Sequence, residues 1–221
     1  SKALTSTGAR PSVDVRFIAY PRGVMQPTLR LTSTDDLAQA GSKKSLRESS
    51  QSERQAVAAR LTRFLNKRPK ELVDRPIHLL DFSPIDLPIA ELLASTNDEI
   101  RVTRLAESAV AAELLSERDP GAEILECTLD RLQSDGPDGF DVVHTALMLG
   151  SRRELPLMTG LTQLGRLGMH GFLWTDRVKQ SQPMKAKRVR DLARRVDLEF
   201  CAYKKPIRST LFSLSGWRPQ L

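Results

Sequence analysis

The sequence has few of the residues on which disulfide-bonded, metal-binding or membrane-spanning proteins depend. Its only cysteines, Cys127 and Cys201, lie far apart, each within an apolar stretch. This spacing suits neither a disulfide framework nor a zinc site, and it favours a reducing compartment. No apolar run reaches the roughly 18–20 residues that cross a bilayer, and the polar N-terminus lacks the apolar core of a secretory signal. We therefore expect a cytoplasmic protein with no membrane contact.

Aromatic side chains are also scarce, at 5% of the 221 residues, whereas Lys and Arg exceed Asp and Glu by 34 to 27. The resulting net charge of +7 makes this a basic protein that can attract nucleic acid or an acidic partner. No basic stretch is interleaved with aromatic residues, as in surfaces that stack bases. The densest basic run, residues 185–195, is therefore interpreted as the solvated face of a helix.

Several catalytic signatures are missing. The three histidines are scattered without metal-ligand spacing, so no metal site is expected. The sequence has no Gly-x-Ser-x-Gly elbow, P-loop or Cys-x-x-Cys pair. Hydrolase, nucleoside triphosphatase and redox chemistry therefore have no support.

The chain divides into two parts by composition. Residues 1–50 are rich in Ser and Thr, and residues 42–52 contain almost no apolar side chains. Such a segment cannot offset its ordering entropy by burial, which predicts an N-terminal arm with a flexible linker. Within it, residues 13–20 alternate as a short strand or docking arm would. Residues 51–221 are expected to form one α/β domain.

In that domain, helical and strand patterns alternate. Val57, Leu61 and Leu65 recur at helical spacing after Ser52, the expected N-cap. Strands are then expected at 77–82, 100–105, 123–129, 140–147 and 171–175, helices at 87–94, 108–118, 155–167 and 185–195, and an antiparallel hairpin at 198–203 and 209–214. Because the strands are continuous apolar runs, helices should cover both sheet faces. The pattern predicts a three-layer αβα sandwich with a seven-stranded, mostly parallel sheet and a C-terminal antiparallel hairpin.

The turn after the strand at 77–82 is the most informative segment. The strand ends in Asp81-Phe82, and Ser83-Pro84 leads directly towards a helix. In nucleotide-type α/β folds, the backbone of this turn approaches the polar end of a cofactor, and glycines allow the approach. This turn has the right position and length but contains no glycine.

The order of elements, together with two local motifs, resembles class I S-adenosylmethionine-dependent methyltransferases. The motifs are Phe140-Asp141-Val142-Val143 and the segment from Leu164-Gly165-Arg166-Leu167-Gly168 to Gly171-Phe172-Leu173-Trp174-Thr175-Asp176. The resemblance extends from about residue 52 to residue 214. It implies a methyltransferase-like Rossmann fold and S-adenosylmethionine as the cofactor.

The resemblance also implies which residues would bind the cofactor. The family's first motif, Leu-Asp-x-Gly-x-Gly-x-Gly, is matched by Leu80 and Asp81, with Ser83, Ile85 and Leu87 at the glycine positions. Side chains there crowd the cofactor and disfavour positive φ by roughly 1–2 kcal/mol. The family's ribose-binding acid falls on Ala106, one residue before Glu107, and its adenine-facing residue falls on Thr128. The expected cofactor-binding residues are Asp81, Phe82, Ser83, Glu107, Thr128, Leu129 and His144.

Two residues are candidates for catalysis. His144 follows the fourth-strand signature and is either a general base or a structural histidine, with no aspartate partner evident from the sequence. Asp176 ends the fifth strand and either holds a polar substrate group or caps a helix.

Two functions stay open at this point. The altered glycine motif favours a non-catalytic binding, regulatory or assembly module, a pseudoenzyme with a protein partner or RNA. The alternative is an active, divergent methyltransferase acting on a small-molecule methyl acceptor, because methyl transfer depends mainly on positioning.

Overall fold

A computed structural model of the chain describes residues 17–18, 50–94, 99–129, 131–132, 139–150, 152, 154–177, 186–205 and 210–219. The helices are α2 (Gln51–Leu65), the 3-10 helix η1 (Lys70–Leu72), α3 (Ile89–Ala94), α4 (Ala109–Arg118), α5 (Glu154–Leu167) and α6 (Ala186–Arg195). The strands are β1 (Phe17–Ile18), β2 (Ile77–Phe82), β3 (Ile100–Ala106), β4 (Glu123–Glu126), β5 (Phe140–Ala146), β6 (Gly168–Arg177), β7 (Ala202–Lys204) and β8 (Leu211–Trp217).

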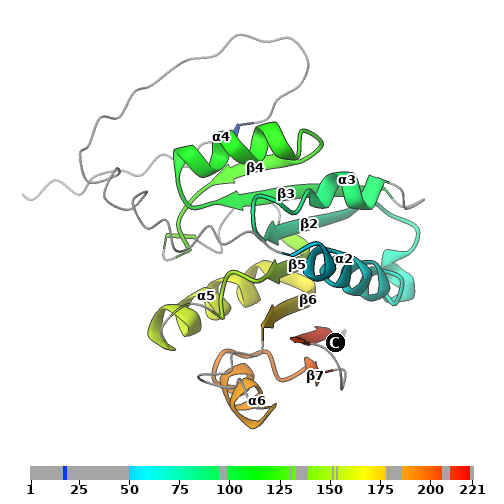
Figure 1. Ribbon diagram of the computed structural model, residues 1–221. Coiled ribbons are helices and arrows are strands. Elements are labelled where there is room, and N and C mark those ends of the chain that lie inside the picture. The colour runs from blue at the N-terminus through cyan, green and yellow to red at the C-terminus, as the bar shows by residue number, and fades with distance from the viewer. Residues whose placement is uncertain are drawn as a thin grey trace, which may run out of the picture.

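The strands form one mixed sheet in the order β1-β4-β3-β2-β5-β6-β8-β7 (Figure 1). Strands β4, β3, β2, β5 and β6 are parallel to their neighbours, while β8 pairs antiparallel with both β6 and β7. The predicted seven-stranded sheet with its C-terminal antiparallel hairpin is thus confirmed. Strand β1, inside the alternating segment 13–20, adds a two-residue antiparallel pairing on the β4 edge.

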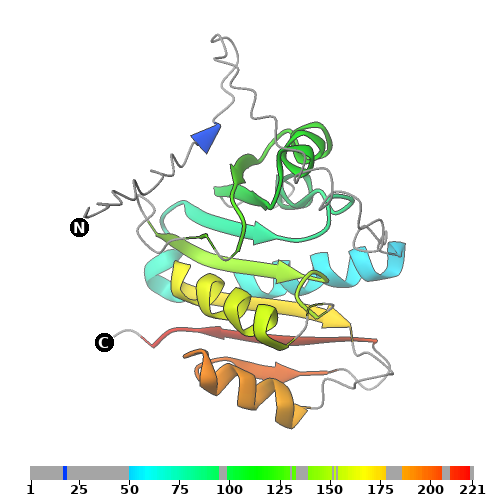
Figure 2. The same cartoon turned by 90° about the vertical axis from the view of Figure 1, so that its left-hand side faces the viewer.

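Helices cover both faces of the sheet, which gives the predicted three layers (Figure 2). On one face, α2 and α3 pack their apolar stripes on β2, β3 and β5, and α4 packs beside them over β3 and β4. On the other face, α5 and α6 bury leucines against Phe172, Trp174 and Phe212. Trp174 is fully buried in this part of the core. Among the described residues, no helix is long and apolar enough to cross a membrane.

Most element boundaries agree with the sequence patterns. β4 ends at Glu126, before the predicted residue 129, and β6 begins at Gly168 rather than at residue 171. The hairpin strands lie at Ala202–Lys204 and Leu211–Trp217 rather than at the predicted 198–203 and 209–214, and α3 begins at Ile89 rather than at residue 87. The segment 134–139, whose Gly, Pro and Asp residues predict a turn, lies almost wholly outside the described residues. The division into an arm and a domain at residue 50 stays a prediction.

Helix α2 is fixed at its start by a reciprocal cap. Ser50 Oγ accepts the backbone N–H of Glu53, and the Glu53 carboxylate accepts the N–H of Ser50 at 3.0 Å. The N-cap is therefore Ser50, and the prediction of Ser52 is wrong, because the Glu53 carboxylate closes this capping box. The same carboxylate pairs with Arg177 at the end of β6, at 2.6 Å. Glu53 thus connects α2 to the sheet.

Glu53→Gln is expected to flatten the pH dependence of the free energy of unfolding. The hydrogen bond from Arg177 lowers the pKa of Glu53 from 4.5 to about 2. Because the folded pKa lies below the unfolded one, this carboxylate stabilises the fold above pH 4.5, and that contribution disappears as the pH falls towards 2. Urea unfolding across this range measures the slope. The exposed Glu113→Gln is the control and should keep the wild-type slope; an unchanged slope in Glu53→Gln would contradict the expectation.

Candidate functional site

Three ionisable residues lie side by side at the centre of the sheet. Parallel pairing sets Arg104 of β3 and His144 of β5 on either side of Asp81 of β2. Paired residues of neighbouring strands point to the same face, here the face covered by α2 and α3. All three side chains are completely buried. Such a group requires internal partners, because an unpaired buried charge is costly.

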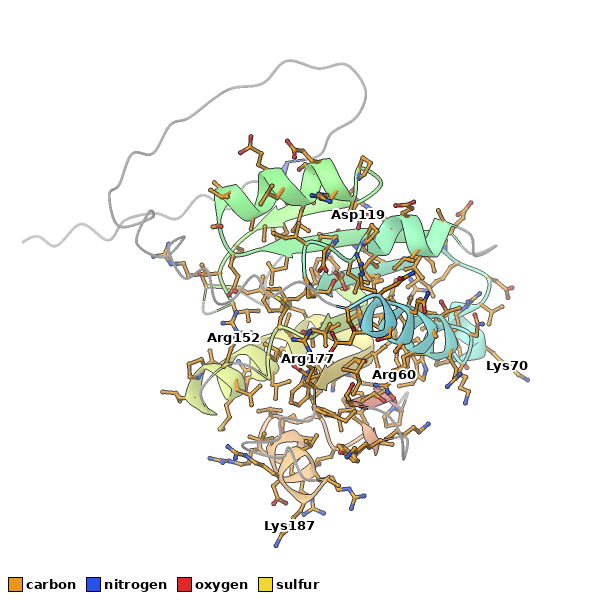
Figure 3. The ribbon with its side chains drawn as sticks, viewed as in Figure 1. Arg60, Lys70, Asp119, Arg152, Arg177 and Lys187 are labelled. Carbon is orange, nitrogen blue, oxygen red and sulfur yellow. The ribbon has the colours of Figure 1, made fainter. Side chains whose placement is uncertain are left out.

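Arg104 has two carboxylate partners. Its Nε forms an ion pair with Asp81 Oδ2 at 3.1 Å, although the two atoms are not aligned for a hydrogen bond. Its Nη1 lies 3.2 Å from Asp119 Oδ2. Asp119 also accepts the N–H groups of Ala90 and Glu91 in the first turn of α3. Figure 3 shows Asp119 between α4 and α3. Arg104 therefore joins β2, β3 and the helices above them.

The same guanidinium holds the turn between β2 and α3. Its Nη1 donates to Leu87 O at 2.7 Å, and its Nη2 donates to Ser83 O at 3.1 Å and to Pro84 O at 2.9 Å. Leu87 is fully buried in the core under α2, and Ile85 is partly buried against the small cluster under α4. This is the turn in which the resembling family carries its glycines. Here three backbone carbonyls of the turn accept hydrogen bonds from the side chain of Arg104.

Asp81 is fully occupied by internal contacts. His144 Nδ1 lies 2.6 Å from its Oδ1, and Ser83 Oγ donates to its Oδ2 at 2.6 Å. Burial alone would raise the pKa of Asp81, but Arg104 and His144 outweigh this and hold that pKa below its usual value. Asp81 is thus the aspartate partner of His144 that the sequence did not reveal. His144 Nε2 is buried and has no hydrogen-bond partner among the described residues.

A second group of contacts bridges the carboxyl edge of the sheet. Glu107, after β3, accepts the N–H of Leu129 at 3.4 Å and forms an ion pair with Arg152. The Arg152 guanidinium lies 5.6 Å from the ring centroid of Phe82, a cation–π contact. Phe82 and Leu129 are almost fully buried. The end of β2 and the segments that follow β3, β4 and β5 therefore meet here, and three of the four residues are predicted cofactor contacts.

Thr128 and Asp176 differ in whether their buried side-chain oxygens have hydrogen-bond partners. Thr128 Oγ1 is buried without a hydrogen-bond partner among the described residues. Asp176 accepts hydrogen bonds from the N–H groups of Gly150 and Arg177 and from the Trp174 indole. Burial raises the pKa of Asp176. Asp176 thus anchors the loop after β5, a structural role, and no substrate group is required to satisfy it.

The structure brings most of the predicted residues into two groups. Asp81, Ser83 and His144 share the buried charge cluster, and Phe82, Glu107 and Leu129 share the bridge at the sheet edge. Arg104 and Arg152, which organise the two groups, were missed by the sequence reasoning. Arg104 did leave a signal, since it is one of two arginines in the mostly apolar strand Ile100–Ala106 and lies directly before Leu105 and Ala106. Arg152 left none, because one arginine in a polar loop is ordinary.

Two shallow cavities open at the opposite edge of the sheet. Their volumes are about 280 and 470 Å³, and both are lined by Arg75 and Ile77 at the start of β2. No predicted site residue lines either of them. Within the part of the chain that the structure describes, no group of three or more His, Cys, Asp or Glu side chains could hold a metal ion.

Comparison with solved structures identifies the fold. The magnesium protoporphyrin IX methyltransferase of Synechocystis PCC 6803 with bound S-adenosylmethionine superposes with a TM-score of 0.55 at 9% identity, over 75% of this chain and 79% of that one. The amino pentose methyltransferase of Micromonospora echinaspora, also with bound S-adenosylmethionine, gives 0.53 at 11% identity, over 86% and 99%. A methyltransferase of Aquifex aeolicus gives 0.52 at 12% identity, over 77% and 99%.

The chain therefore has the class I methyltransferase fold, as the sequence motifs predicted. No protein-family model and no curated protein matches the sequence. At these identities the solved structures show the fold, and activity has to be argued from the site.

Arg104→Met is expected to lower the free energy of unfolding by about 3–5 kcal/mol, because it leaves two buried carboxylates without their cation. Arg101→Met, on the same strand, is the matched control: Arg101 forms an exposed pair with Glu123, and its loss should cost less than about 1 kcal/mol. Urea unfolding measures both. If Arg104→Met does not fold, Arg104→Lys, which keeps the charge but loses the planar fork, should fold with reduced stability. Equal losses at residues 101 and 104 would contradict the role of Arg104.

Proposed function

We propose that this protein is a non-catalytic binding or assembly module built on the methyltransferase fold. The observation that carries the proposal is the contact of Arg104 with three carbonyls of the turn after β2. In the resembling family, that turn approaches the cofactor. Here it is held down on the sheet by a buried side chain of the protein, and the turn has no glycine.

The residues at the sheet edge do not fit S-adenosylmethionine. Leu87 and Phe82 are buried side chains in the segment where the family leaves room for the methionine part. Glu107, the acid nearest the expected ribose position, is already paired with Arg152 and with the Leu129 N–H. Asp81 is fully engaged by Arg104, His144 and Ser83. Internal contacts thus replace those expected from a cofactor.

An active divergent methyltransferase is the second candidate, and two observations favour it. The Glu107–Arg152 pair is about one quarter to one third exposed, and pairs of this kind are worth little in water. Opening it would free a carboxylate for ribose hydroxyls. Thr128, which the resemblance matches to the adenine-facing residue, has a buried Oγ1 without a hydrogen-bond partner among the described residues, and a ligand would satisfy it. Neither observation makes room at Leu87, so the non-catalytic function is the better supported.

Thermal unfolding with and without millimolar S-adenosylmethionine or S-adenosylhomocysteine tests the proposal. A ligand at 100 times its dissociation constant stabilises a fold by about 2.7 kcal/mol, and each kcal/mol moves the midpoint by roughly 2–4 °C in a domain of this size. We expect no shift for the wild-type protein. A clear upward shift with either ligand would contradict the proposal and support the methyltransferase alternative.

The variant Arg152→Ala tests whether the Glu107–Arg152 ion pair or the turn after β2 is what excludes the cofactor. This variant frees Glu107 without touching the buried cluster, and Arg101→Ala is its control for loss of an exposed arginine. If the turn after β2 excludes the cofactor, Arg152→Ala should show no ligand-induced shift either. A shift in Arg152→Ala alone would mean that the ion pair, and not the turn, closes the site.

A further inference from the structure

The two edges of the sheet differ in what protects them against a further strand. At one edge lies β7, a three-residue strand in which Ala202 and Lys204 are exposed, and an exposed lysine opposes pairing. At the other edge lies β4, with only the two-residue β1 beyond it (Figure 1). β4 has two apolar residues at its centre, Ile124 and Leu125, and a glutamate at each end. The β4 edge is therefore the one suited to receive another strand.

The outer edge of β4 is rigid before any strand joins it. β3 pairs with β4 in parallel. Ile124 is buried in the cluster that contains Ala112 and Leu115 of α4, and Leu125 is buried in the core on the opposite face of the sheet. The faces of β4 are thus covered, and its unpaired backbone groups lie on the outer edge. A preformed edge of this kind loses little conformational freedom when a strand binds.

Strand β1 shows what this edge accepts. It pairs antiparallel with β4, with Phe17 opposite Leu125 and Ile18 opposite Ile124. This register sets apolar residues opposite apolar residues, and such cross-strand pairs stabilise a sheet. Two of the four β4 residues take part in the pairing. The contact itself therefore identifies an extended peptide strand as the occupant of the edge.

The charges at the ends of β4 add a second element of complementarity. Glu123 is paired with Arg101 of β3 at 2.8 Å. Glu126 is exposed and forms no ion pair or hydrogen bond within the part of the chain that the structure describes. When the β1 register is continued by one residue, Arg16 falls opposite Glu126. Opposite charges at directly facing positions are favourable. Residues 16–18 thus match residues 126–124 position by position.

The connection from β1 to the domain makes this contact reversible. The 32 residues 19–50 separate β1 from α2, and they include the predicted flexible linker. A flexible connection of this length spans about 30 Å on average, and it holds its end at an effective concentration in the millimolar range. The strand therefore binds its own edge readily, and a competing strand can replace it.

We infer that the β4 edge is a strand-addition site, occupied by the arm's own residues 16–18, and that its partner is an extended peptide segment with the same pattern of one basic and two apolar residues. In this mode of recognition, backbone hydrogen bonds supply affinity and the order of side chains supplies specificity. The inference deepens the proposed function and rests on it, because it names the partner class of the binding module.

The test is fluorescence anisotropy of the full 221-residue chain with a labelled peptide that has the sequence of residues 11–22. The variant Phe17→Pro/Ile18→Pro releases the chain's own strand, because proline has no N–H to donate to a strand ladder. We expect this variant to bind the peptide about tenfold or more tightly than the wild type, whose own strand competes at a millimolar effective concentration.

Two controls isolate the strand. The chain variant Leu37→Pro/Ala38→Pro introduces the same two prolines between β1 and α2 and keeps β1, so it should bind the peptide as weakly as the wild type. A peptide that itself carries Phe17→Pro/Ile18→Pro should bind none of the chains. Circular dichroism and the unfolding midpoint verify that each variant folds.

A charge reversal locates the peptide on β4. In the released variant, Glu126→Lys should weaken peptide binding by about two- to fivefold, the range expected for a facing pair of charges. A peptide with Arg16→Glu should recover that loss. Glu113→Lys is the matched control, since Glu113 is exposed on α4 and the change in net charge is the same.

Three results would overturn the inference: no peptide binding to the released variant, equal binding to the released variant and the wild type, or equal binding of the peptide with two prolines. Sedimentation velocity adds a fourth, because dimers of the released variant that the peptide does not dissociate would assign the edge to a second copy. The proposed function fails separately, since a thermal shift with S-adenosylmethionine overturns it whatever the peptide does.

Discussion

The buried guanidinium of Arg104 is the interaction on which the candidate site depends. It lies between two buried carboxylates, Asp81 and Asp119, and donates to the carbonyls of Ser83, Pro84 and Leu87. Three separate segments, β2 with its turn, β3, and the junction of α4 with α3, therefore meet at one cation. In a medium that screens charge poorly, such a group is stable only when all its partners are present together. The same side chain, Arg104, therefore sets both the geometry of the turn and the charge balance of the core.

The proposed non-catalytic role depends on the turn after β2. A turn that is to receive a charged ligand needs free N–H groups and space for close approach. This turn has a proline, a buried leucine, and three carbonyls bound to an arginine. At the sheet edge, Phe82, Glu107, Leu129 and Arg152 are joined by contacts with one another. These internal contacts are what supports the proposal of a binding role on a fold shared with methyltransferases.

Helix α6 and strand β7, at one edge of the sheet, are separate from this central cluster. α6 attaches to the core through its apolar stripe, and its exposed residues Lys187, Arg190 and Arg194 lie outside that stripe. β7 is a short edge strand that ends in Lys204 and is followed by Lys205, and lysines at an edge protect it against pairing with other strands. The charges at the centre of the sheet are buried and paired, whereas these charges at its edge are exposed.

The sequence by itself determined the layers, the succession of strands and helices along the chain and the resemblance to methyltransferases, because apolar periodicity and the order of elements are local properties of the chain. It also showed that the turn after β2 lacks glycine. It did not reveal that Asp81 is the partner of His144, that Arg104 joins Asp81 to Asp119, or that Arg152 closes over Phe82 and Glu107. Those contacts join residues between 15 and 70 positions apart, and only the parallel register of β3, β2 and β5 and the packing of the loops bring them together. Residue identity fixed which charges are present, and tertiary structure decided which of them neutralise one another.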